Sequence, residues 1–75
     1  MNNINANEKQ SQSQTKAICS YLESGNALTG LEAINLFGCI RLASRISDLR
    51  SSGHPIADRW ITTASGKRVK QYYIA

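Results

Sequence analysis

The sequence predicts one small α+β domain in which three helices precede a C-terminal β-hairpin. The chain has 75 residues, which is room for a single domain. Before Pro55, apolar residues recur at helical spacing in three segments; after it, two segments are rich in β-branched and aromatic residues. A domain this small leaves little room for a large active-site cavity, so a multi-layer enzyme is excluded.

Residues 1–12 are predicted to form a disordered polar arm, and residues 13–75 the folded domain. The arm consists mainly of Asn, Gln, Ser and Lys, which bury too little apolar surface to offset the entropy lost on ordering. The first helix is expected to begin between Ser11 and Ser13, because Ser11 and Gln14 fit a capping box. Its apolar face consists of Ala17, Ile18, Tyr21 and Leu22.

The second and third helices each carry their own start or stop signals. Thr29 and Glu32 form a capping box at the start of the second helix, and Gly38 ends it. The apolar residues of the second helix are Leu31, Ile34, Leu36 and Phe37. The third helix is predicted over residues 41–52, and Gly53 stops it. Its buried stripe is predicted to be Leu42, Ala43, Ile46 and Leu49, packed against Ile18, Leu22 and Ile34.

The hairpin is predicted from residues 56–63 and 68–74, which flank a short connection containing Gly66. Trp60 is expected to close the hairpin onto the helices as a core residue. Lys67, Arg68 and Lys70 lie at or beside the connection, so the tip of the hairpin is expected to be basic.

Positive charge is concentrated in the second half of the chain. The net charge is +4, and the distribution is uneven: residues 1–40 sum to −1, whereas residues 41–75 sum to +5. Such asymmetry favours a polyanionic partner, with nucleic acid as the leading class, although a charged surface that serves only solubility is the alternative. No apolar run is long enough to cross a membrane, and the N-terminus lacks the order of a secretion signal, so a cytoplasmic protein is expected.

Metal, cofactor and catalytic sites are not expected. Two cysteines and one histidine cannot supply the four Cys/His ligands of a structural zinc site, and Cys19 and Cys39 are read as reduced core thiols. The sequence places no nucleophile or carboxylate with His54, so no enzyme and no small-molecule substrate are predicted.

Three stretches together resemble a known family. Residues 28–33 (LTGLEA), 41–50 (RLASRISDLR) and 53–56 (GHPI) are similar to the small winged helix-turn-helix proteins of bacteriophages and prophages, and the resemblance extends over residues 16–74. In the familiar spacing a glycine follows the small residue of the first motif helix by four positions, whereas Phe37 follows Ala33 here and Gly38 is displaced by one. A longer turn is therefore expected, with the groove-facing register of the third helix shifted by about one position.

The resemblance implies a sequence-specific protein that binds double-stranded DNA, with the third helix in the major groove and the wing on the backbone or minor groove. It implies a phage or prophage regulator of transcription or recombination, located in the bacterial cytoplasm and at the nucleoid when bound. The candidate DNA-binding residues are Arg41, Ser44, Arg45, Lys67, Arg68 and Lys70. Asp48 is interpreted as an orienting partner of Arg41 or Arg45, because a carboxylate would repel phosphate.

The alternative function is a winged protein-interaction module that binds and modulates a host protein, since a fold does not fix a function. A third possibility that the residues do not exclude is an RNA-binding winged domain, and a homodimer is a further state that the sequence leaves open.

Overall fold

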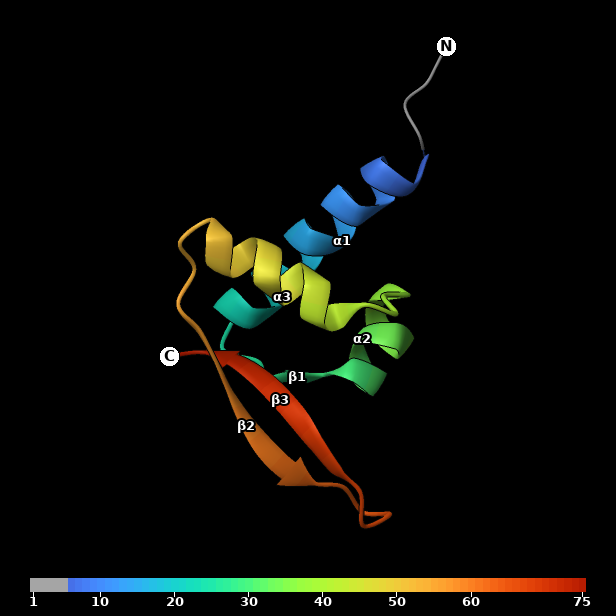
Figure 1. Ribbon diagram of the computed structural model, residues 1–75, viewed down its shortest axis with the longest axis vertical. Helices are drawn as coiled ribbons and strands as arrows, with labels where there is room; N and C mark the ends of the chain where they lie inside the picture. The colour runs from blue at the N-terminus through green and yellow to red at the C-terminus, as the bar shows by residue number, and fades with distance from the viewer. Residues whose placement is uncertain (1–5) are drawn as a thin grey trace.

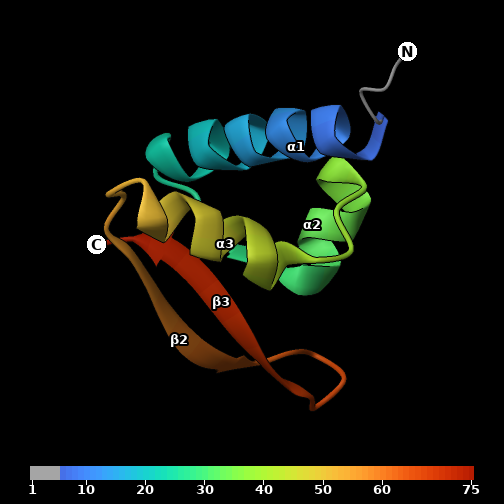
Figure 2. The same cartoon turned by 45° about the horizontal axis from the view of Figure 1, so that its top comes forward.

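The computed structural model describes residues 6–75 of the chain, with side-chain surroundings from residue 12 onward. Its element order is α1 (Ala6–Glu23), β1 (Leu28–Thr29), α2 (Gly30–Phe37), α3 (Leu42–Ser51), β2 (Ile56–Thr62) and β3 (Arg68–Ile74). Figures 1 and 2 show the β2–β3 hairpin extending away from the three helices, with its turn far from α1. The predicted order of three helices followed by a hairpin is confirmed. In this part of the chain no helix is both long enough and apolar enough to span a bilayer.

Helix α1 begins earlier than the sequence analysis predicted. It starts at Ala6 rather than between Ser11 and Ser13, so residues 6–12 of the predicted disordered arm are helical. Ala, Glu, Lys and Gln dominate this stretch and are strong helix formers, and extending an existing helix adds a hydrogen bond for each residue. The prediction considered burial and overlooked this propensity. The rest of the predicted arm, residues 1–5, lies outside the described residues.

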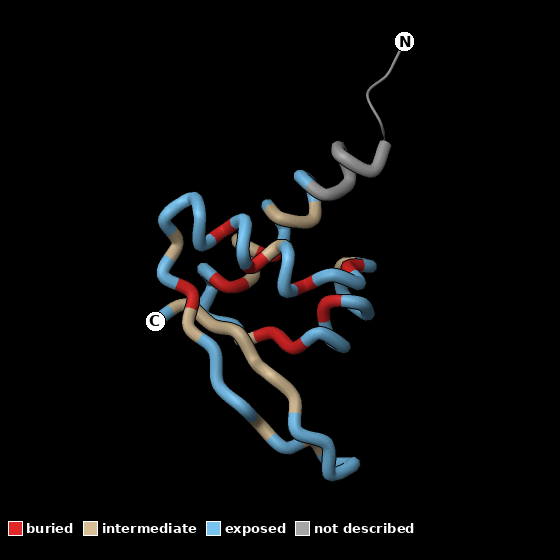
Figure 3. Tube along the Cα trace, in the orientation of Figure 1, coloured by how far each residue is buried: buried red, intermediate tan, exposed pale blue. Residues whose placement is uncertain are grey.

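The hydrophobic core lies where the three helices and β1 meet, and Figure 3 shows buried residues concentrated there while the hairpin turn is exposed. Its buried members are Ile18, Leu22, Leu28, Ala33, Cys39, Leu42, Ile46, Leu49 and Ile56. The predicted packing of α3 through Leu42, Ile46 and Leu49 is confirmed. Ala43 is exposed, contrary to the prediction, because it lies at the edge of the stripe on the side that faces the hairpin.

Helix α2 contributes less to the core than its apolar sequence suggested. Ile34, predicted as a core partner of α3, is 44% exposed, and Leu31 and Leu36 are exposed as well. The side of this two-turn helix that meets α1 carries Ala33 and Phe37; the Phe37 ring packs edge-on against Tyr21 at 5.5 Å. Spacing showed which residues of α2 are apolar, but only the packing against α1 selects the buried side.

The turns that end α2 and α3 use glycine as expected. Gly38 has φ 64° and Gly53 has φ 97°, in the left-handed region that favours glycine. After α3, the Gly53 N–H donates to the Arg50 carbonyl and the His54 N–H to the Leu49 carbonyl, which is the Schellman pattern. The position and backbone of His54 are therefore fixed by the end of α3.

The sheet contains one strand more than the hairpin. Strand order is β1-β3-β2, and both pairs are antiparallel. The two residues of β1 pair with β3, Leu28 opposite Tyr72, so the segment after α1 is tied to the end of the chain. In the hairpin, Trp60 lies opposite Lys70 and Thr62 opposite Arg68. Because side chains alternate along a strand, Trp60, Arg68 and Lys70 share one face of the hairpin.

The start of α2 offers a test of the capping box. The Thr29 N–H donates to Glu32 Oε1 at 2.9 Å, and the Glu32 N–H donates to Thr29 Oγ1 at 3.3 Å. We expect Thr29→Ala to lower the free energy of unfolding by about 1 kcal/mol, because it leaves an amide of the first turn without its acceptor. Glu32→Gln is the matched control, since glutamine also completes a capping box. Urea denaturation measures both; equal losses in the two variants would contradict a capping role for the Thr29 hydroxyl.

Candidate functional site

The hairpin carries a cluster of cations around an exposed indole ring. The Arg68 guanidinium carbon lies 5.3 Å from the centre of the Trp60 ring, and Lys70 Nζ lies 5.2 Å from it. Both distances are within the range of a cation–π interaction. Trp60 is 57% exposed, so its predicted place in the core is wrong. Along β2 it shares a face with Asp58 and Thr62, beyond the point where the helices cover the sheet.

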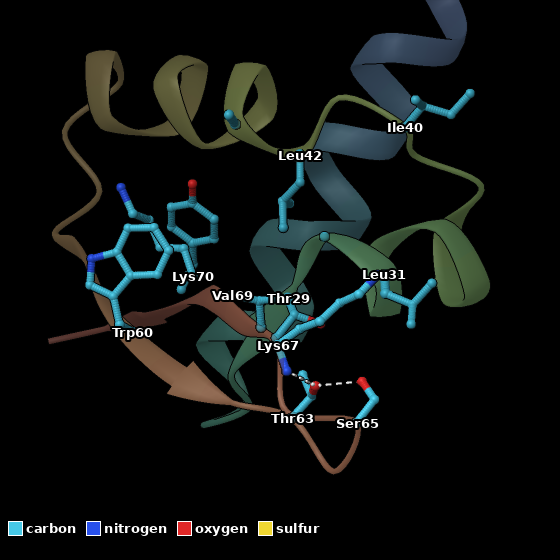
Figure 4. A pocket seen from close by; sticks show the side chains of 13 residues that line it. Thr29, Leu31, Ile40, Leu42, Trp60, Thr63, Ser65, Lys67, Val69 and Lys70 are labelled. Atoms are coloured by element: carbon cyan, nitrogen blue, oxygen red, sulfur yellow. Dashed lines mark hydrogen bonds between the residues drawn. The ribbon is translucent and has the colours of Figure 1, made fainter.

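A groove of about 710 Å³ separates this face of the hairpin from the helices. Figure 4 shows Trp60 and Lys70 on the hairpin side, with Leu42 pointing in from α3. The other lining residues are Thr29, Gly30, Leu31, Ile40, Ala43, Thr63, Ser65, Lys67, Val69 and Tyr72. Apolar side chains supply the floor, and lysines supply polar groups along the hairpin. The start of α3 and the basic part of the hairpin therefore border one depression.

The predicted DNA-binding residues at and near the start of α3 lie on different sides of this helix. Arg41 is exposed at the N-cap of α3, and Ser44 is exposed on the outer side. Ala43 lines the groove, which identifies the side of α3 that faces the hairpin. Arg45 follows Ala43 by two residues, about 200° around the helix, so it projects from the opposite side. The structure thus brings Lys67, Arg68 and Lys70 together on the hairpin but separates Arg45 from them.

Arg45 is also largely covered. Only 15% of its side chain is exposed, and its Nη1 lies 3.4 Å from Asp48 Oδ2, so the predicted pairing of Asp48 occurs with Arg45. The buried Nε of Arg45 has no hydrogen-bond partner within the part of the chain that the structure describes. A guanidinium held in this way has less freedom to reach a ligand than the exposed one of Arg41.

Arg50, which the sequence analysis did not select, connects α3 to the base of the hairpin. Its Nε donates to the Ile56 carbonyl at 3.0 Å, and its Nη2 donates to Asp58 Oδ2 at 2.9 Å. The guanidinium also lies 6.0 Å from the centre of the Tyr72 ring. Contacts to two strands fix the angle at which the hairpin leaves α3. No local sequence signal indicates this role, because the contacts depend on how β2 folds back beside α3.

The ion pairs leave a positively charged surface. Asp48 and Asp58, the acidic residues of the second half of the chain, pair with Arg45 and Arg50. Among the described residues, no carboxylate lies within 4.0 Å of the side-chain nitrogens of the remaining cations of that half. These are Arg41, Arg59, Lys67, Arg68 and Lys70. Arg59 differs from the hairpin cluster, since it donates to Gln71 at 2.8 Å and lies over the Tyr73 ring on the other face of the hairpin.

The arrangement suits the binding of a polyanion. Lysine and arginine side chains without acidic partners attract phosphate, and an exposed aromatic ring offers a surface for stacking or apolar contact. A family model described as a winged helix-turn-helix domain matches residues 13–75. No curated protein and no solved structure matches the chain.

Proposed function

Since the chain belongs to the winged helix-turn-helix domain family, whose fold suggests DNA binding, we propose that it is a sequence-specific protein for double-stranded DNA. The observation that carries the proposal is the group of cations at the hairpin, with Arg68 and Lys70 on one face of β3 and Lys67 in the adjoining turn, all without acidic partners among the described residues. These cations contact phosphates or the minor groove, while the exposed side of α3 enters the major groove. The protein acts by occupying its site and performs no chemistry.

In this proposal the exposed residues at the start of α3 contact the edges of the DNA bases. Arg41 lies between Ile40 and Leu42, both of which line the groove, and Ser44 is exposed one turn further along. Arg45 retains a supporting role, because its ion pair with Asp48 and its burial restrict its reach. The similarity of residues 28–33, 41–50 and 53–56 to phage and prophage proteins supports a regulator of transcription or recombination as the biological role.

The test compares two substitutions of Arg41. A cognate duplex is first selected from a random duplex library, and each variant is then titrated against cognate and random duplexes. Arg41→Ala should reduce the preference for the cognate duplex by about 1–3 kcal/mol, which is the discrimination that a bidentate base contact provides. Arg41→Lys keeps the charge but loses the planar fork, so it should reduce the preference while retaining most affinity for random duplex. Unchanged preference in both variants would exclude Arg41 as a base reader.

A second candidate function is a protein-interaction module that binds a host protein. The observation that favours it is the exposure of large apolar side chains on α2 and the turn after it, where Leu31 is 69% and Ile40 is 84% exposed. The dependence of binding affinity on salt concentration distinguishes the two functions. Binding through phosphates weakens steeply as salt rises, whereas an apolar protein interface responds little. If no duplex binds with a steep salt dependence, the DNA function fails and the protein-binding function replaces it.

A further inference from the structure

Three groups with metal-ligating chemistry lie together where α1 meets the turn that follows α3. Cys19 Sγ is 3.8 Å from Nδ1 and 3.7 Å from Nε2 of His54. Glu23 completes the group, and the ligand atoms of the three residues all lie within 4.8 Å of one another. Cysteine and histidine alone are too few to predict a metal site from the sequence, which reveals neither the contribution of the Glu23 carboxylate nor the approach of His54 to Cys19.

The three residues belong to fixed parts of the backbone. Cys19 and Glu23 are four residues apart in α1, so their side chains lie on the same face of the helix. His54 is held by the Schellman turn after α3, and its carbonyl accepts from the Ile56 N–H at 2.9 Å. Ligands on such elements are positioned more accurately than ligands on free loops.

The distances are close to those of a tetrahedral metal site. With Zn–S of about 2.3 Å and Zn–N of about 2.0–2.1 Å, a sulfur and a nitrogen ligand lie about 3.5 Å apart. The sulfur is almost equally far from the two ring nitrogens, so a rotation of the imidazole directs either one to a shared ion. Thiolate, imidazole and carboxylate are the donors that zinc prefers, and water supplies a fourth position on the exposed side of Glu23.

The electrostatics argue against an activated thiol. Burial raises the pKa of the Cys19 thiol, and the nearby Glu23 carboxylate raises it further by its charge and by accepting a hydrogen bond. A nucleophilic cysteine shows the opposite change, because its pKa is lowered by positive neighbours. A divalent cation between the two groups would remove the repulsion between thiolate and carboxylate.

We propose that Cys19, Glu23 and His54 bind a zinc ion, which links α1 to the turn between α3 and the hairpin. The site holds the base of the hairpin against α1, so occupancy stabilises the folded domain. Mg²⁺ and Ca²⁺ do not fit this site, because these hard cations prefer a shell of oxygen donors.

The experiment uses the full chain, reduced and freed of metal, without DNA. Titration with Co²⁺ should give a thiolate-to-cobalt charge-transfer band that saturates at one equivalent, and added Zn²⁺ should remove the band by displacing the cobalt. Zn²⁺ should also raise the melting temperature in a concentration-dependent manner, whereas Mg²⁺ should leave it unchanged.

Substitutions identify the ligands. Loss of a group that only hydrogen-bonds to a metal ligand costs about 10–100-fold in metal affinity, so loss of a ligand itself in Cys19→Ser or His54→Gln should weaken zinc binding by at least about 100-fold. Glu23→Gln should weaken zinc binding as well, and its mild change in shape keeps the test independent of folding. Cys39→Ala is the control: it removes the other thiol and should retain the charge-transfer band.

A missing charge-transfer band and an unchanged melting temperature in the parent protein would overturn the proposal. So would a band that survives Cys19→Ser, or zinc affinity that is unaffected by both His54→Gln and Glu23→Gln. Because no DNA is present, these outcomes are independent of the proposed DNA-binding function.

Discussion

Ile46→Ala is expected to lower the free energy of unfolding by about 2–5 kcal/mol, the usual cost of truncating a buried isoleucine. Ile46 is 1% exposed and lies in the middle of α3, among the buried residues of α1 and of the segment before α2. The loss has two parts, namely the transfer of the removed methyl and methylene groups and the cavity that remains. A small domain has a total stability of only about 5–15 kcal/mol, so this single change removes a large share of it.

Ile40→Ala is the matched control, because it makes the same truncation at a side chain that is 84% exposed. Its effect should lie within about 0.5 kcal/mol of zero, as is usual for surface substitutions. Urea denaturation followed by circular dichroism compares the two variants with the parent. Equal stabilities of the Ile46 and Ile40 variants would show that the buried side of α3 has been assigned wrongly.

Removal of the hairpin cluster is expected to have the largest effect on binding. The triple variant Lys67→Ala, Arg68→Ala, Lys70→Ala removes cations that have no acidic partner among the described residues. For each phosphate contact, the binding constant is proportional to the salt concentration raised to the power of about −0.9. One contact therefore increases the affinity roughly eightfold at 0.1 M salt relative to 1 M. Three contacts contribute roughly 500-fold, and their loss reduces the salt slope by about three units.

The loss should be similar for cognate and random duplexes, because phosphate contacts carry no base information. Arg59→Ala is the control, since it removes a cation from the other face of the same hairpin. Fluorescence anisotropy at several salt concentrations gives both affinity and slope, and a melting curve verifies that the triple variant is folded. An unchanged salt slope in the triple variant would mean that the hairpin does not contact the phosphates.

Much of the fold follows from signals that act within a few residues. The capping box of Thr29 and Glu32, the glycine stops at Gly38 and Gly53, and the pairing of two β-rich segments were all predicted and are all present. In α3 the spacing of Leu42, Ile46 and Leu49 also identified the buried stripe, because this helix carries its long apolar side chains on one side only. The early start of α1 is also determined by nearby residues, through their helix propensity rather than their burial.

The candidate site was predicted in part. Lys67, Arg68 and Lys70 were found because a basic hairpin turn is visible in sequence, whereas Trp60 was misplaced because an aromatic residue is usually buried. Whether a tryptophan on a strand is covered depends on how far the helices extend over the sheet, and Trp60 lies beyond that limit. The spacing of Arg41 and Arg45, four residues apart, also predicted DNA contacts for both of them.

The sequence by itself determined the three helices and the hairpin, where each helix stops, and which half of the chain is basic, because hydrogen bonding and periodicity act over short distances along the chain. The tertiary structure alone decided which sides of these elements face each other. The folded structure covers most of the Arg45 side chain, and the end of α3 brings His54 to Cys19, 35 residues away. Contacts of this kind depend on the relative positions of whole elements, which no short stretch of sequence encodes.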